Sequence, residues 1–177
     1  VNIAQPLITA LPSCPEKPIL QNRLDVLKQY IVAESAVSIA EEVSTQANID
    51  KAQTLVDALP VGSNKTYLQN RIDTIKNNIL AMGKAKEAVK KAQQTYLQAD
   101  LNNAQSLVNV LPDGLVKIDL QTTIDGIQDY INTMLRVSAA VEKAESTKNI
   151  IDVDNAQNEI NNLVFGTFRT DLQNRLD

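Results

Sequence analysis

The sequence predicts an all-α protein made of tandem three-helix bundles, a spectrin-like array in which helix C of one repeat is continuous with helix A of the next, so that the whole forms an elongated rod. Three observations lead to this prediction. Four stretches of the chain match one another at intervals of about 50 residues. Apolar residues recur within each stretch at the spacing of one helix face, and proline occurs at the same place in three of the four copies.

Two motifs define the repeat. One begins with Ala-Gln, and sixteen residues after its glutamine comes the glutamine of a second motif that begins with Leu-Gln. Successive copies are offset by 48, 52 and 52 residues, so the first interval has a four-residue deletion, between Asp25 and Ala36. Because four residues are close to one α-helical turn, we interpret the deletion as a turn lost from a continuous helix. The paired glutamines are Gln5 and Gln21, Gln53 and Gln69, Gln105 and Gln121, and Gln157 and Gln173.

The Ala-Gln motif, which we call segment B, is expected to be a helix of about 11 to 13 residues. In the second copy Ile49, Ala52, Leu55, Val56 and Leu59 define one apolar face. Asn or Asp at one repeat position predicts the N-cap of this helix, and proline predicts its end. The predicted N-caps are Asn48, Asp100 and Asp152, and the prolines are Pro12, Pro60 and Pro112.

The Leu-Gln motif (segment C) and an Ala-Val-x-x-Ala motif that follows it (segment A of the next copy) are expected to form one long helix. The apolar stripe that begins at Leu68 continues to Val89 without a change of period, and no proline interrupts it. We predict a helix of about 31 residues from Thr66 to Tyr96, roughly 46 Å long, with segment B folding back about 18 Å, so that each repeat advances about 25 to 30 Å.

Since a single amphipathic helix cannot hide its stripe, segments A, B and C together form the unit that closes a core. The predicted division is a partial repeat with segments B and C only (1–34), two three-helix repeats (35–81 and 82–134), and a repeat truncated in its last helix (135–177). Both chain ends fall inside predicted repeats. We therefore expect the sequence to be a piece of a longer protein.

Composition limits the function classes. Apolar residues make up 44% of the chain and aromatic ones 3%, so the cores are expected to be aliphatic. The formal net charge is −4 with both signs mixed along the chain, which argues against nucleic acid as a partner. No apolar run approaches the roughly 18 residues of a membrane-spanning helix, so we expect no membrane insertion by this segment.

No catalytic, cofactor or metal site is predicted. The chain has no histidine, no Gly-rich phosphate loop, no Gly-x-Ser-x-Gly motif and no Cys/His metal set, so we do not expect an enzyme. Cys14 is the single cysteine, and the neighbouring Pro12, Ser13 and Pro15 offer no activating cation. We interpret Cys14 as an ordinary loop residue.

The Gln-Asn-Arg-x-Asp motif of segment C is one candidate ligand site. It recurs with Arg23, Arg71 and Arg175, whereas the third copy has Thr122 and Thr123 in place of Asn-Arg. An arginine among acids is suited to an anionic ligand. Polar residues beside an apolar stripe more often cap or bridge neighbouring helices, and we favour that interpretation.

Acidic residues near the start of segment B, namely Asp50, Asp152 and Asp154, are candidates for binding a cation. However, the Asp-x-Asp-x-Asp-Gly loop and distal Glu of a calcium site are absent. Helix capping and the favourable interaction of acids with a helix N-terminus explain these residues more simply.

Glutamate pairs are the remaining candidates for acid–base chemistry. Glu41 and Glu42 are adjacent and so point to different sides of a helix, while Glu142 and Glu145 lie on an exposed-looking face. Catalysis by a carboxylate pair needs convergent, desolvated acids. We therefore expect none of these four to be catalytic.

Two further features have structural explanations. The N-glycosylation triplet Asn64-Lys65-Thr66 lies in a predicted loop between segments B and C, where turn chemistry explains it equally well. Phe165 and Phe168 replace the Pro-Gly turn in the last copy, and we expect them to plug the end of a core more than to form a binding patch.

The repeat pattern resembles the tandem three-helix modules of secreted cell-wall, surface-layer and adhesin-like proteins of Gram-positive bacteria. The matching elements are Ala-Val-x-x-Ala-Glu, then Asp-x-x-Ala-Gln-x-Leu-Val-x-x-Leu-Pro, then Lys-x-x-Leu-Gln-x-Arg-Leu-Asp, most complete from Ala36 to Asp177. The resemblance implies an extracellular location, secreted or at the bacterial surface. It also implies a spacer that carries other domains, and it supplies no ligand residues.

Two functions follow as hypotheses. The first is a structural spacer or stalk whose partners are the neighbouring domains of the same longer chain. The alternative is a helical binding module that recognises a host protein or a cell-wall polymer. A multivalent binder would repeat its exposed side chains, yet the stretches that we expect to be exposed, 84–86, 136–138 and 165–169, differ between copies. This favours the spacer.

Overall fold

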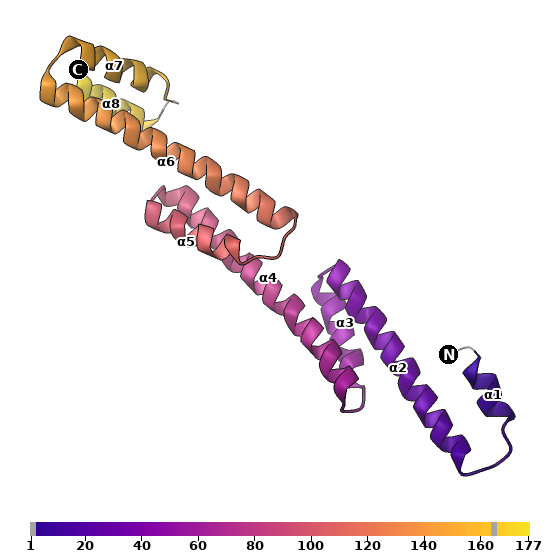
Figure 1. Cartoon of the computed structure of the whole chain (residues 1–177). Coiled ribbons are helices and arrows are strands. Elements are labelled where there is room, and N and C mark those ends of the chain that lie inside the picture. The colour runs from indigo at the N-terminus through magenta and orange to yellow at the C-terminus, as the bar shows by residue number, and fades with distance from the viewer. Residues whose placement is uncertain (1–2, 164–165) are drawn as a thin grey trace. The chain divides into compact units, whose positions relative to one another are not determined.

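The computed structural model describes residues 3–163 and 166–177 and is all-helical over those residues, which confirms the all-α class and a bundle of helices. Long helices alternate with shorter ones along the chain (Figure 1). The helices of the described chain are α1 (Ala4–Ala10), α2 (Glu16–Glu42), α3 (Gln46–Asp57), α4 (Ser63–Thr95), α5 (Gln98–Asn109), α6 (Leu115–Thr147), α7 (Ile150–Asn161) and α8 (Thr167–Leu176).

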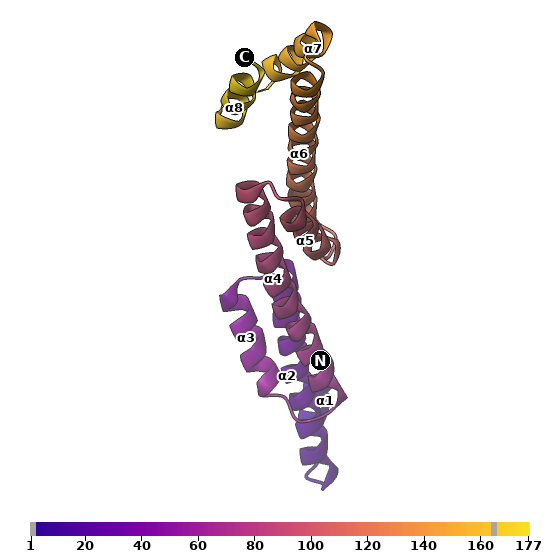
Figure 2. The ribbon, with the colours of Figure 1, turned by 90° about the vertical axis from the view of Figure 1, so that its left-hand side faces the viewer.

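Contacts divide the chain into two compact units, Val1–Ala81 and Met82–Asp177. In the first unit, residues of α2, α3 and the first half of α4 share one buried aliphatic cluster, with α3 packed against α2 (Figures 1 and 2). Alanines beside branched residues let the helix backbones approach closely. The cluster comprises Ala33, Ala36, Val37, Ala40, Ile49, Ala52, Val56, Leu59, Leu68, Ile72 and Ile75.

In the second unit, α5 packs against α6, and α7 and α8 pack against the C-terminal half of α6 (Figure 1). The helices α6, α7 and α8 share a buried cluster that includes Val141, Ile160 and Leu172, and Phe168 packs against this cluster. This confirms the core role predicted for Phe168, while Phe165 lies outside the described residues. No buried side chain among the described residues is polar or charged.

The buried stripe of segment A begins one turn earlier than its motif indicates. The sequence suggests that the stretches around residues 85 and 137 are exposed, but Ala85 and Val137 are 0% exposed. They occupy the repeat position of the buried Ala33. In α4, Ala85, Val89 and Ala92 then follow one another at helical spacing. This expectation about exposure is therefore wrong.

α3, α5 and α7 have the predicted length, at 12 residues each, whereas α1 has seven. α1, α3 and α5 end two or three residues before a proline. The predicted N-caps of α3, α5 and α7 are wrong by one turn, because α3 is capped by Thr45, α5 follows Leu97, and α7 is capped by Asn149. The residues predicted as caps, Asn48, Asp100 and Asp152, are instead the third residue of each helix.

The long helices are continuous through the predicted junctions. α4 has 33 residues and matches the predicted helix within three residues at each end. α2 is unbroken across residues 25–36, where the deletion lies, as expected for a turn lost from a helix. None of the helices in the described chain combines the length and apolar character needed to cross a bilayer. The division into repeats at residues 1–34, 35–81, 82–134 and 135–177 stays a prediction from the sequence.

Candidate functional site

The two glutamines that define the repeat bond to each other across a pair of helices. In the second copy Gln53 Nε2 donates to Gln69 Oε1 at 2.7 Å, and Gln69 Nε2 donates back to Gln53 Oε1 at 3.2 Å. The same reciprocal amide pair forms in every copy, always between residues sixteen apart. The fixed spacing in the sequence is therefore the spacing of an antiparallel side-chain contact between segments B and C.

An aspartate completes this contact, and we call the three side chains the glutamine clasp. The second glutamine of each pair also donates to the carboxylate four residues later, as Gln69 does to Asp73 Oδ1 at 3.0 Å. Equivalent bonds are present in the other copies. In the first two copies a lysine, Lys28 or Lys76, also donates to the segment B glutamine. In the second, third and fourth copies each clasp glutamine donates twice, once to its partner amide and once to the side-chain oxygen of the residue four positions later, so these amides are engaged within the helix pair.

A basic side chain near the start of each segment C binds the carbonyls at the end of segment B. Lys65 Nζ donates to Leu59 O at 3.0 Å and to Asp57 O at 2.6 Å. The carbonyls of the last helical turn have no partner within their own helix, so a cation there stabilises the helix end. The equivalent donors are Lys17, Lys117 and Arg169.

In the second and fourth copies, the arginine of the Gln-Asn-Arg-x-Asp motif forms a bidentate ion pair with a glutamate thirty residues earlier. Arg71 reaches Glu41 with Nε at 2.8 Å and Nη2 at 2.6 Å, and Arg175 reaches Glu145 at 2.9 and 2.7 Å. Hydrogen bonding to arginine lowers the pKa of Glu41 and of Glu145. This confirms the interpretation as a bridge between helices for Arg71 and Arg175, but not for Arg23. At the same positions the third copy has Gln93 and Thr123, so both partners of the pair are replaced together.

Asp100 and Asp152 hold the start of α5 and α7 to the preceding long helix. Asp100 accepts bonds from Lys91 Nζ and Thr95 Oγ1 at 2.7 and 2.8 Å, and Asp152 accepts from Lys143 and Thr147 at the same distances. These bonds lower the pKa of both carboxyl groups.

The other acidic candidates do not converge. Asp50 accepts a bond from Gln46 within α3, while Asp154, Glu42 and Glu142 are exposed. Within the part of the chain that the structure describes, no three metal-ligating side chains gather. Cys14 is half-buried in the loop between α1 and α2, and its carbonyl accepts the amide of Lys17.

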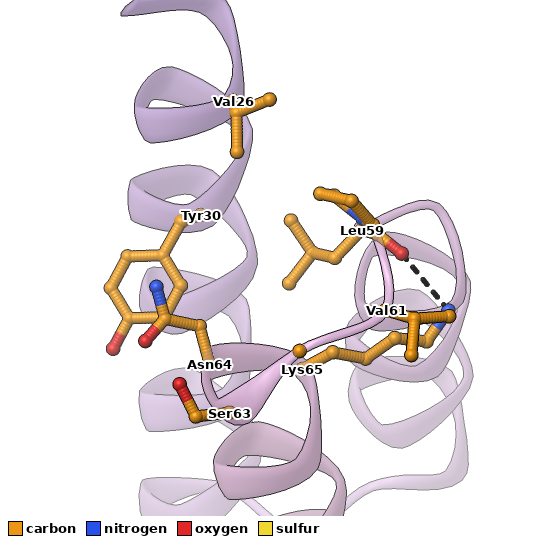
Figure 3. A pocket seen from close by; sticks show the side chains of 9 residues that line it. Val26, Tyr30, Leu59, Val61, Ser63, Asn64 and Lys65 are labelled. Carbon is orange, nitrogen blue, oxygen red and sulfur yellow. Dashed lines mark hydrogen bonds between the residues drawn. The ribbon is translucent and has the colours of Figure 1, made fainter. Parts of the chain in front are cut away.

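A hollow beside α2 is lined by both polar and apolar side chains (Figure 3). Val26 and Tyr30 of α2 face Leu59 in the connection between α3 and α4, and Asn64 and Lys65 in the first turn of α4. Its volume is about 170 Å³, below the roughly 300 Å³ of small-molecule sites. Its cation, Lys65, is already engaged by helix carbonyls, as the dashed line in Figure 3 shows. Asn64 of the glycosylation triplet is exposed here, but the triplet lies in the first turn of α4, so its predicted place in a loop is wrong.

This chain is similar to the minor extracellular protease Epr of Bacillus subtilis, with 34% identical residues over 148 aligned positions. The alignment covers 84% of this chain and 23% of the protease, so the chain spans less than a quarter of that relative's length. No family model matches the chain, and no solved structure matches it. The matched part is thus a minor portion of a longer extracellular protein.

Proposed function

We propose that this chain is a structural spacer or stalk segment of a secreted bacterial cell-surface protein, built from tandem three-helix units that hold other domains apart. Each long helix contributes segment C to one three-helix repeat and segment A to the next. Consecutive repeats are therefore joined by a helix instead of a flexible loop. Its partners are the neighbouring domains of the same longer chain.

The observation that carries the proposal is the use of the repeated polar side chains. The polar positions that recur in all four copies are the two glutamines, the aspartate of the clasp and the basic residue that caps segment B. Each of them bonds inside its own pair of helices. A multivalent binder needs repeated side chains that are available to a ligand, whereas a spacer needs repeated side chains that hold its helices together.

The similarity to an extracellular protease supports a secreted location and a longer parent protein. We do not extend the protease activity to this segment. The chain contains no histidine. Among the described residues, the carboxyl groups whose pKa is lowered belong to ion pairs on the surface between helices, and not to a cleft. A spacer accompanying a catalytic domain is consistent with a matched part of 23%.

Removal of one repeat tests the modular organisation. Met82 and Met134 stand at the same repeat position, so deleting residues 82–133 joins Ala81 to Met134 in register. The shortened chain should keep the helical content per residue of the natural chain and unfold cooperatively, as measured by circular dichroism with urea. The matched control deletes residues 82–107, which breaks the register and should lose helicity. Loss of structure in both deletions alike would contradict the proposal.

Sedimentation with purified Gram-positive cell walls distinguishes the spacer from the binding module. A spacer should stay in the supernatant when walls containing peptidoglycan and teichoic acid are pelleted, while a known wall-binding module sediments as the positive control. Saturable co-sedimentation of this chain would favour the alternative function and overturn a purely structural role.

A further inference from the structure

The α1–α2 pair has an uncovered core face. These helices carry the same clasp as the other copies, with Gln5 bonded to Gln21, and the same cap from Lys17. Leu24 is buried between them, but the rest of their core is partly open to solvent. Leu27 is 47% exposed, whereas Ile75 and Ile127 at the same repeat position are 6% and 5% exposed.

The same contrast holds on the other side of this core. Ile8 of α1 and Leu20 of α2 are half-buried. Their counterparts Val56 and Leu68 in the second copy are 0% exposed. The first pair of helices therefore presents the apolar side chains of a core that is closed elsewhere in the chain.

The other copies show what closes such a core. In the first buried cluster, Ala36, Val37 and Ala40 of α2 pack with residues of α3 and α4. In the cluster of α6, α7 and α8, the corresponding part is Val141 and Ala144 of α6. In both cases the cover is a segment A helix that is joined to the start of the segment B helix.

Charge points to the same cover. Arg71 and Arg175 each clamp a glutamate at the end of segment A. Arg23 is their counterpart, is exposed, and has no hydrogen bond or ion pair within the described residues. A hollow of about 280 Å³ runs along Arg23 and Leu27 of α2 and is bordered on its other side by Asn64 of α4.

We propose that the α1–α2 face is a docking site for one further segment A helix, joined directly ahead of α1, with a stripe of alanine and valine and a glutamate that Arg23 clamps. This inference rests on the repeat organisation in the proposed function. The register fixes the contact: the glutamate lies thirty residues before Arg23, as Glu41 does before Arg71.

The test adds a helix of this type to the full chain. Residues 135–152 placed ahead of Val1 carry the segment A of the last unit and put Glu145 in register with Arg23. Amide hydrogen exchange of α1 should slow by about tenfold or more, because a tenfold change corresponds to only about 1.4 kcal/mol of local stability. Arg23→Met in the extended chain should remove part of this protection, so that α1 exchanges faster than in the extended natural sequence.

The matched control is the same extension with Val141→Asp in the added helix, which keeps the tether but cannot pack into the apolar face. Equal protection of α1 by both extensions, or by neither, would overturn the proposal. Sedimentation velocity of the natural and extended chains adds a second readout. A dimer in which α1 is equally protected with and without the extension would show that a second copy occupies the face, and would also overturn the proposal. Failure here, with the repeat deletion still folded, would leave the spacer function standing.

Discussion

The arginine–glutamate clamp should be transferable to the copy that lacks it. Gln93 and Thr123 occupy the positions of Glu41 and Arg71, with the same separation of thirty residues. Both lie in the second compact unit, on α4 and α6. Gln93→Glu together with Thr123→Arg should therefore rebuild the two-pronged ion pair seen in the other copies.

The expected gain is modest because the pair faces solvent. The side chains of Arg71 and Glu41 are 20% and 40% exposed, and both partners of the Arg175 pair are 40% exposed. Exposed pairs contribute about 0.2–1 kcal/mol, and two-pronged geometry favours the upper part of that range. We expect a coupling free energy of about 0.5–1 kcal/mol between the two substitutions.

A double-mutant cycle measures this coupling. The natural chain, both single variants and the double variant are unfolded with urea and followed by circular dichroism. The coupling should weaken in about 1 M salt, where the Debye length falls to about 3 Å. Thr122→Arg with Gln93→Glu is the control, since Thr122 lies about 100° away around the helix. Additive effects in the Thr123 cycle, or equal coupling in both cycles, would refute the proposed geometry.

Four other predictions concern stability. Ile72→Ala should cost about 2–5 kcal/mol because the side chain is 0% exposed, while Ile79→Ala, 41% exposed, should cost clearly less; equal losses in urea unfolding would contradict the assigned core. Gln69→Ala should cost about 0.5–1.5 kcal/mol by leaving Gln53 without its amide partner, and an unchanged urea midpoint would argue against the clasp. Gly126→Ala should stabilise α6 by about 0.5–1 kcal/mol because a Cβ there meets no atom within 4 Å; a lower melting temperature would contradict this. Stability should stay nearly constant from about pH 5 to 8, since the chain has no histidine, and fall below about pH 4. Carboxyl groups with a lowered pKa stabilise the folded state above their unfolded pKa and lose that contribution as they are protonated, so unchanged urea midpoints at pH 3 would contradict the ion pairs of Glu41, Asp100, Glu145 and Asp152.

Helix content and continuity could be predicted because they depend on local signals. A stripe that keeps its period from Leu68 to Val89, without proline, required one helix, and α4 is that helix. A deletion close to 3.6 residues was compatible with an unbroken α2 for the same reason. Prolines located the ends of the short helices, since proline cannot continue a helix.

Helix starts were less predictable because polar side chains serve more than one position in the first turn. Asp100 is the third residue of α5 and bonds to Lys91 and Thr95 of the preceding helix. Its position in the sequence is equally suited to an N-cap. Only the fold shows that α5 begins after Leu97, a residue with no capping side chain.

Contacts between helices could not be derived from single segments. The spacing of sixteen residues between Gln53 and Gln69 was visible, but its meaning required the two helices to lie antiparallel with these amides face to face. The partner of Arg71 lies thirty residues away, beyond any local motif. A useful signal was present in the third copy, where Gln93 and Thr123 differ together from the other copies.

Small-angle X-ray scattering of the natural chain and of the chain lacking residues 82–133 tests most directly whether the protein is an extended spacer of repeated units. A compact chain of 177 residues has a radius of gyration of about 16 Å. The spacer should have a clearly larger value, and the deletion should shorten its maximum dimension by one repeat, about 25 to 30 Å. A radius near 16 Å, or a maximum dimension that does not change with the deletion, would contradict the proposed spacer.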